Sequence, residues 1–117
     1  MGAVRALLDE QAIVGFSTHT TPQIASAIKT TATYIAVGPV FGTTTKDTGY
    51  TAVGLDLVRA ARRATNRPVV AIGGVTLDNA AAAVEAGATM VAVISDLLVG
   101  GNPTERVRRY RDVLRST

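Results

Sequence analysis

The sequence predicts an α/β fold in which parallel strands alternate with helices. Four short apolar runs recur along the 117 residues, and each is followed by a stretch with helical spacing. The runs are nearly continuous in apolar residues rather than alternating, which is typical of parallel strands covered on both faces. The length and an ordinary composition, 47% hydrophobic and 18% charged, predict a single domain over residues 1–117.

The predicted strands are the four apolar runs, at residues 12–16, 34–37, 68–72 and 90–94. The first helix starts at Thr21-Pro22, which supplies an N-cap and then proline in the first helical position. Its apolar residues are Ile24, Ala25 and Ile28.

The remaining helices follow the later strands. The second has the apolar stripe Leu55, Val58 and Ala61. Thr76 is the predicted cap of the third, which runs through Ala80, Ala83 and Val84 and stops at Gly87. Pro103-Thr104 opens the last helix, and residues 4–8 read as the tail of an earlier one.

Two folds fit this alternation. A doubly wound sheet would place G-x-G-x-x-G after the first strand, which Gly15-Phe16-Ser17-Thr18-His19 does not match. A (β/α)₈ TIM barrel often binds phosphate after its last two strands and at a short extra helix. Here those strands end in Gly73-Gly74 and in Ser95, before a predicted helical turn. We therefore expect the barrel. A full barrel has ~250 residues, so this chain would form about four βα units, which is a half-barrel.

The second strand opens into the most distinctive stretch of the chain. Gly38-Pro39 leads into the hydroxyls of Thr43, Thr44 and Thr45 and the ammonium of Lys46. Hydroxyls, backbone N–H groups and an ammonium all bind phosphate oxygens. The alternative is a plain polar loop, but we interpret the stretch as an anion-binding loop. Gly74 would add close backbone approach at the next strand end.

Two polar residues follow the first predicted strand. We expect Ser17 to contact a ligand, because it shares a rim with the other phosphate-type loops. His19 could act as a base near neutral pH. We interpret His19 as structural, packed under the helix cap, with the catalytic alternative open.

Composition narrows the function further. The chain has no cysteine, which excludes disulfides and thiolate sites and makes a reducing cytoplasm the expected compartment. No apolar run approaches a membrane span. The net charge of +3 comes largely from arginines such as those at 106–111, interpreted as a solvated helix face rather than a nucleic-acid surface. No paired carboxylates occupy the strand ends, so no metal site is predicted; the acidic residues near them are Asp47, Asp56, Asp78 and Asp96.

Four motifs in order resemble the thiamine phosphate synthase family over nearly the whole chain. They are Gly15-Phe16-Ser17-Thr18-His19-Thr20, Gly38-Pro39-Val40-Phe41 with Thr43-x-Thr45-Lys46, Val70-Ala71-Ile72-Gly73-Gly74-Val75-Thr76, and Val91-Ala92-Val93-Ile94-Ser95. The resemblance implies a transferase of thiamine biosynthesis on a (β/α)₈ barrel. Such an enzyme joins a hydroxymethylpyrimidine diphosphate to a thiazole phosphate, with magnesium assisting the loss of diphosphate.

The resemblance also implies roles for individual residues. Ser17 and Lys46 match the family's contacts to the pyrimidine diphosphate, and we take both as the catalytic candidates. The residues that match the grip on the thiazole phosphate are Thr43, Thr44, Thr45, Gly74, Ile94 and Ser95. Gly42 departs from the family, which usually has proline there, so the loop is expected to be less rigid.

The resemblance places the chain in the C-terminal half of the family, so we expect a fragment or a truncated gene product. The family's magnesium-ligating aspartates have no counterpart. Two alternatives remain, a non-catalytic phosphate-binding half-barrel and a protein like the related thiazole tautomerase. We further expect either a homo-oligomer or a missing N-terminal half as partner, because open sheet edges and an apolar inner face need cover.

Overall fold

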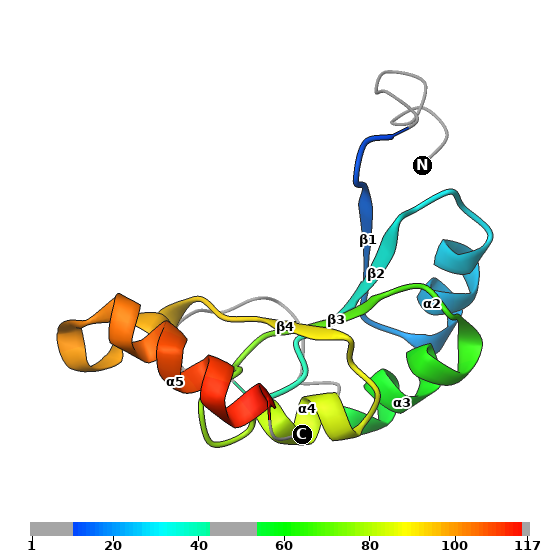
Figure 1. Ribbon diagram of the computed structural model, residues 1–117. Coiled ribbons are helices and arrows are strands. Elements are labelled where there is room, and N and C mark those ends of the chain that lie inside the picture. The colour runs from blue at the N-terminus through cyan, green and yellow to red at the C-terminus, as the bar shows by residue number, and fades with distance from the viewer. Residues whose placement is uncertain (1–10, 43–53, 116–117) are drawn as a thin grey trace.

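The computed structural model describes residues 11–42 and 54–115, which form a four-stranded parallel sheet with helices along one side (Figure 1). The predicted helical tail at 4–8 lies outside these residues. In chain order the elements are β1 Gly15–Thr18, α2 Thr21–Ile28, β2 Tyr34–Val37, α3 Gly54–Ala64, β3 Val69–Ile72, α4 Ala80–Glu85, β4 Met90–Ala92, the 3₁₀ segment η1 Ser95–Gly101, and α5 Pro103–Arg115.

The strands pair in the order β1-β2-β3-β4, all parallel. Each helix contacts the next along the chain, from α2 to α5, on one side of the sheet (Figure 1). A doubly wound sheet reverses its strand order and carries helices on both faces; this one does neither within the described ranges. The predicted α/β fold with a parallel sheet is confirmed. That these four βα units are half of a (β/α)₈ barrel stays a prediction.

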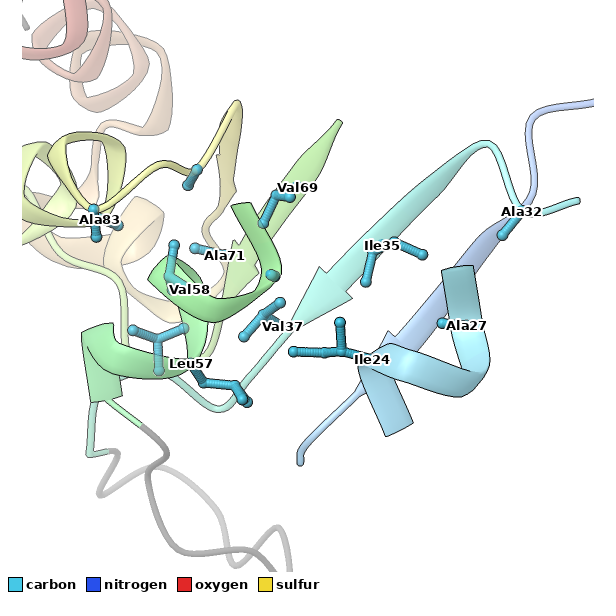
Figure 2. Close-up of a cluster of buried hydrophobic side chains, with 14 residues drawn as sticks. Ile24, Ala27, Ala32, Ile35, Val37, Leu57, Val58, Val69, Ala71 and Ala83 are labelled. Atoms are coloured by element: carbon cyan, nitrogen blue, oxygen red, sulfur yellow. The ribbon is translucent and has the colours of Figure 1, made fainter. Parts of the chain in front are cut away.

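The core lies between the sheet and the helices. Ile35 and Val37 of β2 and Val69 of β3 point toward the helices and are fully buried. Ile24 of α2 and Val58 of α3 pack against them (Figure 2). Each such side chain stabilises the fold by about 1.5–3 kcal/mol relative to exposure. This apolar layer holds the strands against the helices, and the candidate site residues lie at or beyond the C-terminal ends of these strands.

The opposite face of the sheet carries a row of small and medium side chains. Ser17, Ala36, Val70 and Met90 are paired across the four strands, so they share that face. In the part of the chain that the structure describes, no helix covers them, and Met90 is 48% exposed. Cover on both faces of the strands stays a prediction, although Ala36 on this face is already buried.

Three of the predicted strands have different bounds: the first spans Gly15–Thr18, the third Val69–Ile72 and the fourth Met90–Ala92. The first strand begins at Gly15 rather than residue 12, because Thr33 takes up both backbone groups of Val14. Val14 N donates to the Thr33 hydroxyl at 3.0 Å, and Thr33 N donates to the Val14 carbonyl at 2.6 Å. Regular pairing with β2 starts only at Gly15. The fourth strand ends at Ala92, two residues before the predicted end.

The first helix begins one residue earlier than predicted. Thr20, not Thr21, is the N-cap, and its hydroxyl accepts a hydrogen bond from Gln23 N at 3.2 Å. The Gln23 side chain in turn accepts from His19 N at 2.6 Å, close to a reciprocal capping box. Of the predicted apolar residues, Ile24 is buried and Ala25 is exposed.

The third helix begins later than predicted, at Ala80 rather than after Thr76. Thr76 opens a turn instead: its N–H donates to the Asn79 side chain at 2.7 Å, and its carbonyl accepts from Ala80 N at 2.9 Å. The predicted start of the last helix at Pro103 is confirmed. None of the helices described is long and apolar enough to cross a membrane.

Candidate phosphate-binding site

The segments that leave β2 and β3 are joined by backbone hydrogen bonds beyond the sheet. Val40 N donates to the Ile72 carbonyl at 2.9 Å, and Phe41 N donates to the Gly73 carbonyl at 3.0 Å. Gly54 N, at the start of α3, donates to the Val40 carbonyl at 2.9 Å. The residues that flank 43–53 on both sides are thus fixed at the C-terminal edge of the sheet.

Gly73 and Gly74 permit this close approach. Both have positive φ, +97° and +69°, which a residue with a Cβ rarely adopts. A Cβ on Gly73 would lie 2.5 Å from Pro39 Cα, and one on Gly74 would lie 2.6 Å from the Gly42 carbonyl oxygen. The backbone of Gly74 therefore lies directly against the residue that precedes Thr43.

The segment after β4 contributes Ile94 and Ser95. Ile94 is 76% exposed and Ser95 is also exposed, at the start of η1. The next residue, Asp96, is buried, and its Oδ2 accepts from Leu77 N in the turn after β3 at 3.1 Å. The ends of β3 and β4 are held together by this contact, which places Gly74, Ile94 and Ser95 at one edge.

Asp96 was not predicted from the sequence to be a site residue. Its carboxylate also accepts from the Tyr110 hydroxyl and from Arg106 Nη2 at 2.9 Å, both on α5. Burial on its own raises the pKa of Asp96, but the hydrogen bonds from Tyr110, Arg106 and Leu77 outweigh it, so the pKa is lowered from 3.8. The burial of Tyr110 itself, together with its hydrogen bond to Asp96, raises the pKa of the Tyr110 hydroxyl. Arg106 was expected on the solvated face but points inward. A buried tyrosine hydroxyl needs a hydrogen-bond partner, and a search for the partner of Tyr110 would have revealed the cluster.

Stability should depend on pH through Asp96. The carboxyl titrates near 3.8 in the unfolded chain and lower in the fold, so its contribution is present above pH 3.8 and lost as the pH falls through the folded value. At pH 7 we expect Asp96→Asn to lower the free energy of unfolding by about 1–3 kcal/mol, because buried donors lose their acceptor. The difference in free energy of unfolding between Asp96→Asn and wild type should become smaller below pH 3.8. Urea titrations at several pH values would measure it.

Asp56→Asn is the control at pH 7. Asp56 pairs with Arg59 at 2.8 Å but its side chain is 97% exposed, and exposed ion pairs contribute only ~0–1 kcal/mol. If Asp56→Asn lowered the free energy of unfolding as much as Asp96→Asn does, burial of the carboxylate would not determine its contribution to stability.

The other predicted site residues have mixed outcomes. Ser17 lies within β1 rather than after it, exposed on the uncovered face and two strands from β3. His19 Nδ1 bonds the Gly38 carbonyl, which agrees with the structural interpretation. The residues that fall outside the described ranges are Thr43, Thr44, Thr45 and Lys46.

The described carboxylates do not fit a magnesium site. Over residues 11–42 and 54–115 no three acidic, histidine or cysteine side chains converge. The buried Asp96 is already occupied by three donors, and Asp56 is paired with Arg59 at 2.8 Å. No chemical step is therefore assigned to a metal on these residues.

Comparison with known proteins gives one consistent result. A family model described as thiamine monophosphate synthase matches residues 1–97. The chain is 43% identical over 112 residues to a thiamine-phosphate synthase of Koribacter versatilis, covering 96% of this chain and 52% of the relative. It is 46% identical over 112 residues to one of Natronomonas pharaonis, covering 94% and 52%.

A solved structure agrees with these matches. Thiamine phosphate pyrophosphorylase from Pyrococcus furiosus superimposes with a TM-score of 0.83 at 27% identity, covering 97% of this chain and 54% of that one. The chain thus spans about half the length of the relatives it matches.

Proposed function

The chain belongs to the thiamine monophosphate synthase family, and from that membership we propose that it acts in thiamine biosynthesis by binding the phosphate of a phosphorylated thiazole. The reaction proposed for the whole enzyme transfers a pyrimidinylmethyl group, that is, the pyrimidine ring together with its exocyclic methylene carbon. The bond from that carbon to diphosphate breaks, a bond to the thiazole nitrogen forms, and diphosphate leaves. This chain's part in it is to bind and orient.

The residues proposed to hold the thiazole phosphate come from three neighbouring strand ends. Backbone N–H groups of Gly74, Ile94 and Ser95 would donate to its oxygens, with hydroxyls from Thr43 and Thr45 beside them; Thr44 belongs to the same loop. Such bonds to a charged acceptor are stronger than neutral ones. Ser17 and Lys46 are proposed to contact the pyrimidine diphosphate.

One observation carries this proposal. The backbone bonds from Val40 and Phe41 to the end of β3 bring Gly42 against Gly74. The hydroxyl-rich stretch that starts at Thr43 therefore leaves the described fold at the glycine pair. Gly42 and Gly74, which belong to two motifs predicted separately from the sequence, lie in contact.

The test is binding of phosphorylated thiazole by calorimetry to wild type and to Thr43→Val with Thr45→Val. Each lost hydrogen bond to a charged group is worth ~1.5–3 kcal/mol, so the double variant, which loses two, should bind at least about a hundredfold more weakly. Thr31→Val, an exposed threonine that precedes β2 at the other end of the sheet, is the control and should bind normally. Equal affinity of the double variant and wild type would refute the loop's assignment.

A non-catalytic phosphate-binding half-barrel is the second candidate. It is favoured by the described carboxylates, which do not fit the magnesium site that the family's reaction needs. The tautomerase alternative is less favoured, because this chain carries the Thr43-x-Thr45-Lys46 motif, which that branch of the family lacks.

We propose a further partner that covers the bare face of the sheet, either a second copy or an N-terminal half. The exposed Met90 and the edge strands β1 and β4 support this proposal. Nucleic acid is not proposed as a partner, and the cytoplasmic location stays a prediction.

A further inference from the structure

A single carboxylate joins three segments at the proposed phosphate site. Asp96 accepts from Leu77 in the turn after β3, and from Arg106 and Tyr110 on α5, while itself lying in η1. The Arg106 Nε also donates to the Asp96 carbonyl at 3.1 Å. The side chains of Asp96 and Arg106 are only 10% and 16% exposed, so water competes little for these bonds.

A second side chain carries the connection on to Gly74. Asn79 Nδ2 donates to the Gly74 carbonyl at 3.0 Å, and Asn79 Oδ1 accepts from Thr76 N at 2.7 Å. The turn that contains Gly74 is thereby held in shape, and its Leu77 is fastened to Asp96 at 3.1 Å. Because Leu77 directly follows Thr76 and Asp96 directly follows Ser95, three hydrogen bonds and two peptide links relate Gly74 to Ser95.

From this geometry we propose that Asp96 is a positioning residue of the phosphate site, which sets the spacing between the N–H groups of Gly74 and Ser95. It acts through Leu77 on one side and through Arg106 and Tyr110 on the other. The last helix is thus part of the support for the site. This inference rests on the proposed function and adds to it a residue that touches no ligand.

The test compares the affinity for phosphorylated thiazole of wild type, Asp96→Asn and Tyr110→Phe. Asparagine keeps the shape of aspartate but presents an N–H group to donors, so Asp96→Asn should bind roughly tenfold more weakly, as supporting residues of metal ligands do at about 10–100-fold. Tyr110→Phe leaves two of the three donors to Asp96 in place and should therefore lose less affinity than Asp96→Asn. Val58→Ala, in the core of α3, lowers stability without touching the network and should bind normally.

Amide NMR spectra of the free proteins separate positioning from simple loss of stability. Both network variants should shift the Gly74 signal without ligand, and Tyr110→Phe should also shift the Ser95 signal, whereas Val58→Ala should leave both signals in place. Wild-type affinity and unshifted signals in Tyr110→Phe and any folded Asp96→Asn would overturn the inference while the proposed function stands. A wild-type chain that does not bind phosphorylated thiazole would instead overturn the proposed function, and this inference with it.

Discussion

Replacing Gly74 with valine is expected to destabilise the fold by roughly 3 kcal/mol or more and to abolish binding of phosphorylated thiazole. The φ of +69° costs a residue with a Cβ about 1–2 kcal/mol. The new Cβ would also lie 2.6 Å from the Gly42 carbonyl oxygen and 2.7 Å from that of Phe41, and overpacking typically costs another ~1–3 kcal/mol. Urea unfolding and calorimetry would measure the two effects.

Two other glycines separate these causes. Gly42→Ala has neither positive φ nor a neighbour within 4 Å, and should be nearly neutral for stability. Gly100→Ala has a φ of +83° but open space, so it should show the backbone strain alone. If Gly74→Val were no worse than Gly100→Ala, the close contact between the β2 and β3 exits would be wrong.

The isolated chain is expected to form thiamine phosphate at least ~10³-fold more slowly than the full-length Koribacter versatilis relative, with both substrates and magnesium present. Loss of even one stabilising group of an active site costs about 10²–10³-fold, and here the described carboxylates cannot hold a metal on the diphosphate. Product formation followed by chromatography would measure the rate.

A complementation experiment gives the matching control. Adding the separately expressed N-terminal half of that relative should restore part of the turnover if the two halves dock along the free strand edges. Robust magnesium-dependent turnover by this chain alone would contradict the account of its carboxylates and would remove the case for a partner.

The sequence predicted the parallel α/β fold because continuous apolar runs and proline or threonine helix starts are local signals. It misplaced the start of the first strand because a distant group decided it: Thr33 hydrogen-bonds Val14 across the sheet. The start of the third helix was misplaced for a local reason, because the Asn79 side chain three residues on accepts from Thr76 N and makes Thr76 the start of a turn instead of a cap. Contacts between segments far apart in the chain have no local signature.

The same limit applied to the site. Gly74 was predicted from its pairing with Gly73, a local cue, and its backbone does lie at the β2 exit. Asp96 was set aside because it stands in a loop without a second carboxylate. Its role depends on Tyr110 and Arg106, which are brought to it only by the packing of α5.

The most direct measurement of the central claim is an amide NMR titration of the chain with phosphorylated thiazole. The account predicts that the largest shifts fall on Gly74, Ile94 and Ser95. A basic hollow at the C-terminal ends of α2 and α3 offers a clear alternative. It is lined by Ile28, Lys29, Arg63, Ala64, Thr65 and Asn66. Shifts concentrated around Lys29 and Arg63, or no shifts at millimolar ligand, would contradict the claim that these three strand ends form the phosphate site.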